Sequence, residues 1–214
     1  MRKLNRRRPP IGPVPAVRAR GFTIFELMIA VAIAGILAAV AVPNLKVFAQ
    51  NNRLAAGSND LLRAFQVARS EAIKRQQPVA LCGVDDSTVA VPACNYSTFK
   101  NGWIVFVDTA IPAWQTASGS VIVERHGAVD PTVTVKADND RIELYDFSGF
   151  AVPTGTKTPT RNIVLCDVRG TAASNGSSLA RGVLIANTGR ARVTKDPTDI
   201  SPTSGAVTAV GGCP

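Results

Sequence analysis

The chain has 214 residues, of which 24 are lysine or arginine and 15 are aspartate or glutamate, giving a formal charge of +9. Seven of the basic residues precede Phe22, where no acidic residue occurs, so the rest of the chain carries only +2. Overall basicity is therefore weak evidence for a polyanionic partner. The length is sufficient for one membrane element and one ordinary globular domain.

The first element is an apolar run from Phe22 to Leu45 in which Glu26 is the only acidic residue. As a helix it is long enough to cross a bilayer. A carboxylate in hydrocarbon costs about 2.5–3.5 kcal/mol, so Glu26 needs a partner or a function. Two ordinary interpretations are a secretory signal cleaved after Ala39-Val40-Ala41 and a plain anchor whose preceding basic residues stay cytoplasmic.

A third interpretation rests on a specific motif. The segment GFTIFE, Gly21 to Glu26, is followed by LMIAV, and the apolar run ends at Pro43. This pattern closely resembles the class III signal of type IV pilins and type II secretion pseudopilins. The resemblance implies that a prepilin peptidase removes a leader, residues 1–21, and methylates Phe22. The leader is longer and more proline-rich than is typical of that family.

The resemblance also implies what Glu26 does. In a filament, the Phe22 ammonium of one subunit can pair with the Glu26 carboxylate of its neighbour, and a low dielectric strengthens that pairing. Before assembly, segment 22–45 would anchor the chain in the bacterial inner membrane, with the C-terminal domain in the periplasm. Pro43 is expected to weaken or bend the helix.

Beyond Pro43 the sequence becomes periodic, because apolar residues recur at spacings of three, four and seven. One helix is predicted from Phe22 to about Gln76, with segment 46–77 as its amphipathic second half and Pro78 as its end. We interpret the basic residues of this half as a solvated helix face.

Segment 78–214 consists of short apolar or alternating runs, which predict a β-rich domain. The predicted strands are Val79–Cys82, Trp103–Val107, Ser120–Arg125, Thr132–Lys136, Arg141–Tyr145, Asn162–Asp167, Gly182–Ala186 and Arg190–Thr194. Turns are predicted at Asp138–Asp140 and Asn187–Gly189, and a flexible loop at Ala173–Ser178. Strands that follow one long helix imply an α+β domain with an antiparallel sheet packed on the helix.

Two segments narrow the resemblance. Arg63 to Cys82, RAFQVARSEAIKRQQPVALC, and Gly102 to Asp108, GWIVFVD, resemble the FimT/GspH subgroup of minor pilins and pseudopilins. The type IV pilin-like fold with a GspH-type C-terminal domain that this implies agrees with the α+β prediction.

Four cysteines on an apparently exported chain suggest two disulfides. Of three possible connectivities we favour Cys82–Cys94 and Cys166–Cys213, because each would fasten a strand to the loop or tail that follows it.

We find no catalytic residues, and we predict neither a metal site nor a cofactor. The only histidine, His126, ends a predicted strand, and nothing resembles a nucleophile elbow. Asp85-Asp86 is better explained as a solvated loop. Trp103, Phe106 and Phe147 lie in strand-like runs and are predicted to be core residues rather than a base-stacking platform.

The segment Arg181 to Lys195, RGVLIANTGRARVTK, predicts a hairpin around a glycine turn. Alternation along its second strand places Arg190, Arg192 and Thr194 on one face, with guanidinium groups about 7 Å apart. Two explanations fit: a charged edge strand that discourages aggregation, and a positive edge that contacts phosphates.

The tetrapeptide Gly189 to Arg192, GRAR, resembles the GRxR motif by which FimT-like minor pilins contact DNA during uptake. The resemblance implies weak, non-specific binding of double-stranded DNA through Gly189, Arg190, Arg192 and Lys195. Arg181, Arg161 and Arg169 are further candidates for this patch.

Three functions follow. The first is a minor type IV pilin near the pilus tip that binds DNA during natural transformation. The second is a purely structural minor pilin, and the third is a GspH-type pseudopilin of a type II secretion system. The expected partners are prepilin peptidase, other major and minor pilins, double-stranded DNA and the inner membrane, and the final location is an extracellular pilus fibre.

Overall fold

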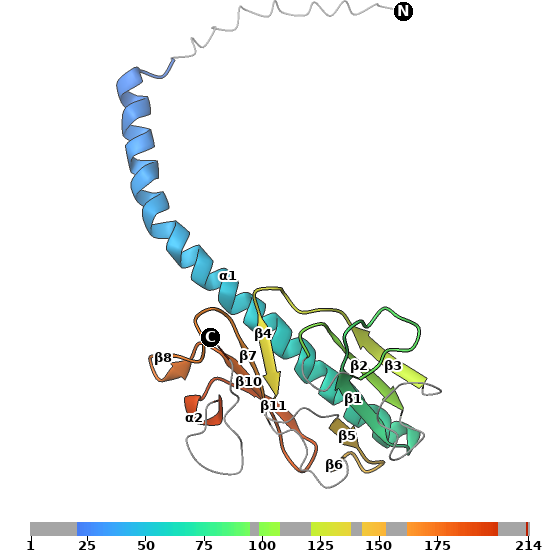
Figure 1. Cartoon of the computed structure of the whole chain (residues 1–214). Coiled ribbons are helices and arrows are strands. Elements are labelled where there is room, and N and C mark those ends of the chain that lie inside the picture. Colours follow the sequence, from blue (N-terminus) through green and yellow to red (C-terminus); the bar gives the residue numbers. More distant parts are fainter. Residues whose placement is uncertain are drawn as a thin grey trace, which may run out of the picture. The chain divides into compact units, whose positions relative to one another are not determined.

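The computed structural model describes residues 21–94, 99–107, 121–137, 143–152, 162–200 and 213. These residues form a long helix, two antiparallel sheets, a small hairpin and a short second helix (Figure 1). The chain divides into two compact units, Met1–Leu45 and Lys46–Pro214, and the long helix α1 (Ile24–Arg75) contributes to both. The architecture is α+β, as predicted.

The N-terminal unit contains the first half of α1, which is long and apolar enough to cross a membrane. The helix begins at Ile24 rather than at Phe22, because Thr23 caps it. Oγ1 of Thr23 accepts a hydrogen bond from the backbone N–H of Glu26 at 3.2 Å. The two residues have the spacing of a capping box. The helix continues through Pro43 without interruption.

The second half of α1 is amphipathic, as the periodicity predicted. Its buried residues form one stripe: Leu54, Gly57, Ser58, Leu61, Ala64, Phe65, Ala68 and Ala72. The helix ends at Arg75 because Gln76 adopts a φ of 54°, the left-handed conformation common at helix C-termini. Pro78 follows at the predicted place.

The two sheets are antiparallel throughout and together contain all eight predicted strands, with ends shifted by up to two residues. The first sheet has the order β3-β2-β1-β5-β6. Its strands are β1 (Val79–Gly83), β2 (Trp103–Val107), β3 (Val121–His126), β5 (Glu143–Tyr145) and β6 (Ala151–Val152). The second has the order β11-β10-β7-β4. Its strands are β4 (Thr134–Ala137), β7 (Asn162–Cys166), β10 (Arg181–Ile185) and β11 (Ala191–Thr194).

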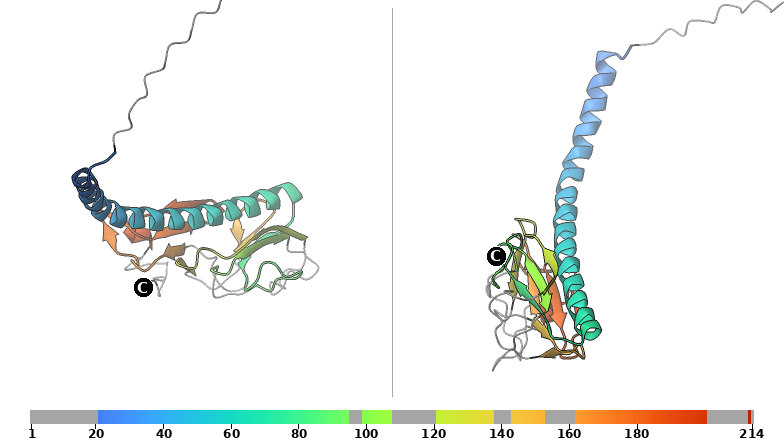
Figure 2. Two further views of the ribbon diagram at one scale, coloured as in Figure 1. Left: turned by 90° about the horizontal axis from the view of Figure 1, so that it is seen from above. Right: turned by 90° about the vertical axis from the view of Figure 1, so that its right-hand side faces the viewer.

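The main core lies between the buried stripe of α1 and the faces of both sheets that are turned toward it. In the right-hand view of Figure 2 the strands lie on one side of this half of the helix. Phe65, Trp103 and Val183 are at most 1% exposed there. Gly57 allows close approach to β7, because a Cβ at this position would lie 3.0 Å from Cδ2 of Leu165. The prediction that Trp103 belongs to the core is confirmed.

Two smaller clusters cover the opposite faces of the sheets. Behind the five-stranded sheet, Ile104 and Phe106 pack with Cys82 and Cys94, so Phe106 is also a core residue. Behind the four-stranded sheet, the second cluster is Val164, Cys166, Ala180 and Ile200, with Cys213 packed against it.

Each of these outer clusters contains one disulfide. Cys82 is bonded to Cys94, and Cys166 is bonded to Cys213. This is the pairing favoured from the sequence. Each crosslink fastens a strand to a later cysteine that packs in the cluster on the outer face of its own sheet.

One prediction about local structure fails, two short elements were not predicted, and one predicted turn is not tested. The segment Ala173–Ser178 is not a loop but a hairpin of β8 (Ala173–Ser174) and β9 (Ser177–Ser178). Asn175 and Gly176 both have positive φ, at 51° and 76°, which is the signature of a type I′ turn. The strand β6 and the helix α2 (Pro197–Ile200) were not predicted. The predicted turn 138–140 lies outside the described residues.

Phe147 is not a core residue, because its side chain is 56% exposed. It lies in the β5–β6 turn, which the Asp146 carboxylate closes by accepting hydrogen bonds from the backbone N–H groups of Ser148 and Phe150. The strand ends at Tyr145, so the alternation that suggested burial stops before Phe147.

Candidate nucleic-acid interface

The β10–β11 hairpin carries the GRAR segment. Ile185 pairs with Ala191 in an antiparallel register. The backbone N–H of Gly189 donates to the carbonyl of Ala186 at 2.8 Å, and Gly189 has a φ of 75°. This is the glycine turn that the sequence predicted, and β11 is an edge strand of its sheet.

Gly189 has a second structural role. It is buried, and a Cβ at this position would overlap the carbonyl oxygen of Gly149 and lie 3.0 Å from Cε1 of Tyr145. The β10–β11 turn therefore packs against the β5–β6 turn of the other sheet. The first residue of GRAR is explained by backbone geometry and packing, without reference to a ligand.

The other three residues of the motif alternate as predicted. Ala191, like Val193, is partly buried against the main core, whereas Arg190 and Arg192 are exposed. The two arginines thus project from the same edge of the hairpin, spaced by two residues. We refer to Arg190 and Arg192 as the basic edge.

The two arginines have different surroundings. Nη2 of Arg192 lies 3.1 Å from Oδ2 of Asp199, which also accepts a hydrogen bond from Oγ1 of Thr194 at 2.9 Å. No carboxylate of the described residues pairs with Arg190. Arg190 can therefore bind an anion directly, whereas Arg192 must first break, or share, its ion pair with Asp199.

Asp199 is the contributor that the sequence analysis missed. It lies in α2, whose N-terminus is capped by Asp196: the backbone N–H and the hydroxyl of Thr198 both donate to Oδ1 of Asp196. An aspartate followed by Pro197 is a recognisable helix start, so the sequence did contain a signal for this turn.

The other candidate residues for DNA contact differ in where they lie relative to Arg190 and Arg192. Lys195 is exposed directly after β11, although continued strand alternation would place it with Ala191 and Val193 rather than with the two arginines. Arg181 lies at the end of β10 away from the turn, and alternation places it with Val183 on the opposite face of the sheet. Burial lowers the pKa of the Arg181 guanidinium. Arg161 lies outside the described residues.

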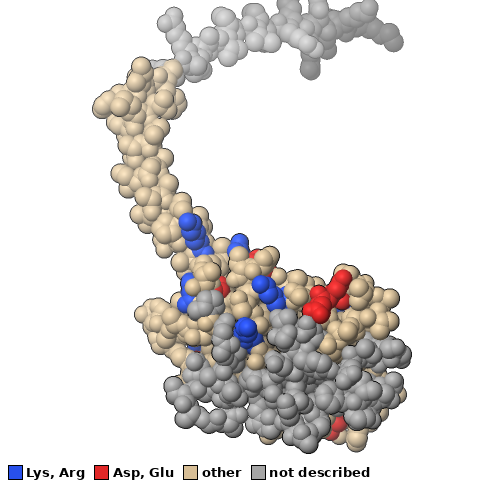
Figure 3. All heavy atoms as spheres, in the orientation of Figure 1, with Lys and Arg blue, Asp and Glu red and all other residues tan. Residues whose placement is uncertain are grey.

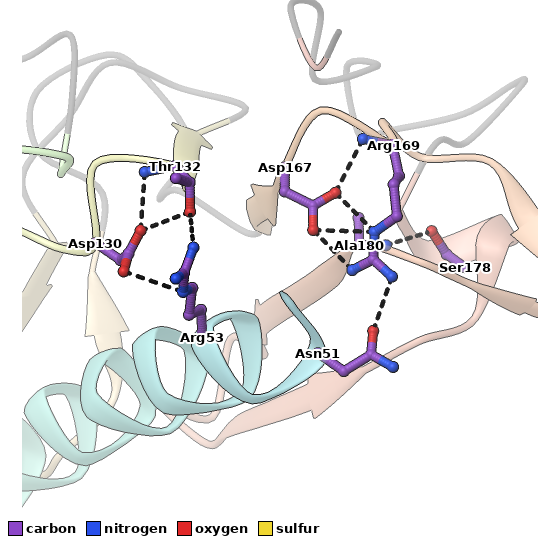
Figure 4. Close-up of polar contacts among 8 residues, drawn as sticks. All are labelled: Asn51, Arg53, Asp130, Thr132, Asp167, Arg169, Ser178 and Ala180. Carbon is purple, nitrogen blue, oxygen red and sulfur yellow. Dashed lines mark hydrogen bonds and ion pairs between the residues drawn. The ribbon is translucent and has the colours of Figure 1, made fainter. Parts of the chain in front are cut away.

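Arg169 makes its contacts with Asp167 and α1 rather than at the β10–β11 hairpin (Figure 4). It binds the carboxylate of Asp167 through Nε and Nη2, and its Nη1 donates to Oδ1 of Asn51 on α1 at 3.1 Å. Two residues further along α1, Arg53 pairs with Asp130 at 3.3 Å. These side chains fasten α1 to the sheets and are not part of the basic edge.

On one face of the molecule the charges of the described residues are dispersed. On the face drawn in Figure 3, lysines and arginines stand in separate groups, with acidic atoms beside some of them. A duplex on this face would meet a small set of cations, so the salt dependence of its affinity would be modest.

The predicted processing site lies just before α1. Gly21 and Phe22 precede the helix and are exposed, and Phe22 is 82% exposed. Glu26 stands in the first turn, where the helix dipole favours a negative charge. Residues 1–20 of the leader lie outside the described residues.

His126 has a packing role. Its ring stacks on Trp103 with centroids 3.9 Å apart, Nδ1 lies 2.7 Å from the carbonyl oxygen of Gly127, and Nε2 faces Asp60 at 3.5 Å. Both ring nitrogens are thus directed at structural neighbours. The described residues contain no cluster of three or more potential metal ligands.

Comparisons with known proteins agree with this arrangement. Residues 57–189 match the family described as type II transport protein GspH, and residues 17–42 match the prokaryotic N-terminal methylation motif. No protein of curated function matches the chain.

Two crystal forms of the type IV minor pilin FimU from Pseudomonas aeruginosa strain PAO1 are similar in structure. In the first the identity is 21% and the TM-score 0.48, covering 73% of this chain and 98% of the crystallised FimU chain. In the second the identity is 18% and the TM-score 0.45, covering 65% and 90%. The GspH match spans more than half of the chain and includes most of both sheets, and the methylation motif includes the Gly21–Glu26 segment. This chain therefore belongs to the GspH family of type IV pilins and pseudopilins.

Proposed function

We propose that this chain is a minor type IV pilin that contacts DNA, without sequence preference, through Arg190, Arg192 and Lys195, and so supports natural transformation. The chain is made with a leader, 1–21, which prepilin peptidase removes. Segment 22–45 then anchors it in the inner membrane, while 46–77 and the domain 78–214 lie in the periplasm. Assembly with other pilins carries it into the fibre.

The match to the N-terminal methylation motif supports cleavage after Gly21 and methylation of Phe22. Once cleaved, the Phe22 ammonium of a neighbouring subunit supplies the positive charge that Glu26 otherwise lacks in an apolar environment. Mass spectrometry of the membrane-extracted chain tests this, with methylated Phe22 expected as the first residue. An N-terminus at Val42 would instead indicate signal peptidase.

The observation that supports DNA contact is the exposed guanidinium of Arg190, which pairs with no carboxylate of the described residues, beside Arg192 on an edge strand. A guanidinium offers planar paired donors that suit phosphate oxygens, and such backbone contacts carry no sequence information. About three neutralised phosphates give a log–log salt slope of about −3, so avidity from several pilins would be needed to hold DNA.

A binding assay on the full chain in nonionic detergent tests the proposal. The seven basic residues of the leader are present in every variant, so the effect of each substitution is the quantity to compare. Arg190→Ala/Arg192→Ala should weaken duplex binding and flatten the salt dependence. Arg63→Ala is the matched control, because Arg63 is exposed on α1 and pairs with Glu124 of the other sheet. Equal binding by the double variant and the wild type would refute DNA contact at this edge.

The family match also favours a second function, a GspH-type pseudopilin whose partners are other pseudopilins and an exported protein. Deleting the gene would then abolish protein secretion rather than pilus assembly or transformation. Loss of pili without any DNA binding would indicate the third possibility, a purely structural minor pilin.

A further inference from the structure

Two turns from different sheets meet at one end of the domain. The β5–β6 turn, Asp146–Phe150, and the β10–β11 turn, Asn187–Gly189, touch where Gly189 lies against the Gly149 carbonyl. The residues that follow these glycines are Phe150 and Arg190. Phe150 and Arg190 thus follow two touching turns, although 40 residues separate them in the sequence.

The β5–β6 turn exposes two phenylalanines. Phe147 is 56% exposed and Phe150 is 51% exposed, and both belong to the β5–β6 turn, which we call the aromatic turn. This turn is rigid, because the Asp146 carboxylate binds two backbone N–H groups and the N–H of Asp146 donates to the carbonyl of Phe150 at 3.1 Å. The rings are therefore held outside the core by a fixed backbone.

A second guanidinium lies under this turn. Nε of Arg69, on α1, donates to the carbonyl of Gly149 at 2.9 Å. Ile73, one helical turn further on, lies against Gly149 and is itself 42% exposed. Exposed aromatic rings beside arginines form the combination on which single-stranded nucleic acids bind: cations hold the backbone and bases stack on the rings.

We propose that Phe147 and Phe150 stack on unpaired bases of a single-stranded nucleic acid whose phosphates are held by Arg190 and Arg192. The inference rests on the proposed function and refines its substrate class. In a duplex the base faces are already stacked, so the rings would add nothing to duplex binding, whereas the arginines serve both forms of DNA. A single-stranded nucleic acid would gain both the stacking on the phenylalanine rings and the phosphate contacts of the arginines.

The test compares two DNA ligands on the full chain in nonionic detergent. One is a labelled 16-nucleotide oligothymidine, and the other is a duplex closed at both ends by non-nucleotide linkers, which has no unpaired bases. Phe147→Ala/Phe150→Ala should weaken binding of the oligothymidine by about fivefold or more per ring and change duplex binding less than twofold. Phe147→Tyr/Phe150→Tyr should retain binding, because the ring faces remain.

Val168→Ala is the matched control, since Val168 is 76% exposed in the turn after β7, at the opposite end of the four-stranded sheet. It should alter neither affinity. Because both phenylalanine side chains are more than half exposed, the alanine variant should fold, and its circular dichroism and disulfides verify this.

The outcomes separate the two proposals. If Arg190→Ala/Arg192→Ala weakens both ligands but the alanine variant binds oligothymidine normally, the stacking inference is wrong and DNA contact stands. If neither pair of substitutions changes binding of either ligand, both are wrong. If the alanine variant keeps its DNA affinity but fails to enter pili, the aromatic turn contacts another subunit instead, and the inference is overturned.

Discussion

Arg169 encloses the carboxylate of Asp167: its Nη2 lies 2.7 Å from Oδ2, in a pair whose side chains are 16% and 4% exposed (Figure 4). The backbone N–H of Arg169 also donates to Oδ1 of the same carboxylate. Removing one partner of a buried pair leaves an uncompensated charge, which costs about 3–5 kcal/mol. Since the arginine is also bonded to Asn51, this pair joins α1 to the turn after β7.

Arg169→Ala should therefore lower the free energy of unfolding by about 3 kcal/mol, measured by denaturant titration of the full chain in detergent. The double variant Asp167→Asn/Arg169→Ala is the control. It should be more stable than the single variant, because no lone carboxylate is left buried. A double variant as unstable as the single one would contradict this account.

The same pair predicts loss of stability in acid. Burial by itself raises the pKa of Asp167, but the hydrogen bonds from Arg169 and its positive charge outweigh burial and hold that pKa below its usual value. A carboxyl whose pKa is lower in the folded state stabilises the fold above its unfolded pKa, about 3.9. That stabilisation is lost as the pH falls through the folded pKa. Thermal unfolding from pH 6 to 2 should show a falling midpoint below about pH 4, less steep in Asp167→Asn.

Asp199→Asn should tighten DNA binding by up to about fivefold, because an exposed ion pair of this kind is worth about 0.2–1 kcal/mol. The asparagine oxygen can still accept the hydrogen bond from Thr194, so the fold is preserved. Asp86→Asn removes the same charge from an exposed loop of the other sheet and serves as the control. If Asp199→Asn and Asp86→Asn bind DNA with the same affinity, the change in net charge rather than the release of Arg192 explains the tighter binding.

Gly189→Ala should destabilise the domain by about 1–3 kcal/mol, because it combines a positive φ with overlap of the Gly149 carbonyl. Thermal unfolding measures this loss. Gly176→Ala is the comparison: its φ is also positive, at 76°, but a Cβ there meets nothing within 4 Å. A Gly189 variant no less stable than this comparison would show that contact between the turns contributes nothing.

Glu26→Ala should insert in the membrane normally yet fail to enter pili. Removing the carboxylate makes the apolar segment easier to insert, but leaves the Phe22 ammonium of the neighbouring subunit without its partner. Quantifying the chain in membranes and in sheared pili measures both effects. Normal incorporation would contradict the intersubunit pairing.

The parts of the fold that sequence could predict are those governed by local periodicity. The buried stripe of α1 and the GRAR hairpin both follow from residue spacing. The exposure of Phe147 was missed because the turn depends on the carboxylate of Asp146 binding successive N–H groups, which is not visible in an apolar pattern.

The site was predictable only in part, for a related reason. The exposure of Arg190 and Arg192 follows from alternation along one strand. Their difference does not, because Asp199 reaches Arg192 through the packing of α2 on β10. The approach of Gly149 to Gly189 is likewise a tertiary contact between sheets, and no spacing within either segment encodes it.

The placement of the disulfides divides the domain into two kinds of stabilised layer. Both Cys82–Cys94 and Cys166–Cys213 lie in the outer clusters, and neither crosses from α1 to a sheet. The contact between α1 and the sheets is therefore held by packing, hydrogen bonds and ion pairs alone, whereas covalent crosslinks secure only the outer faces of the sheets.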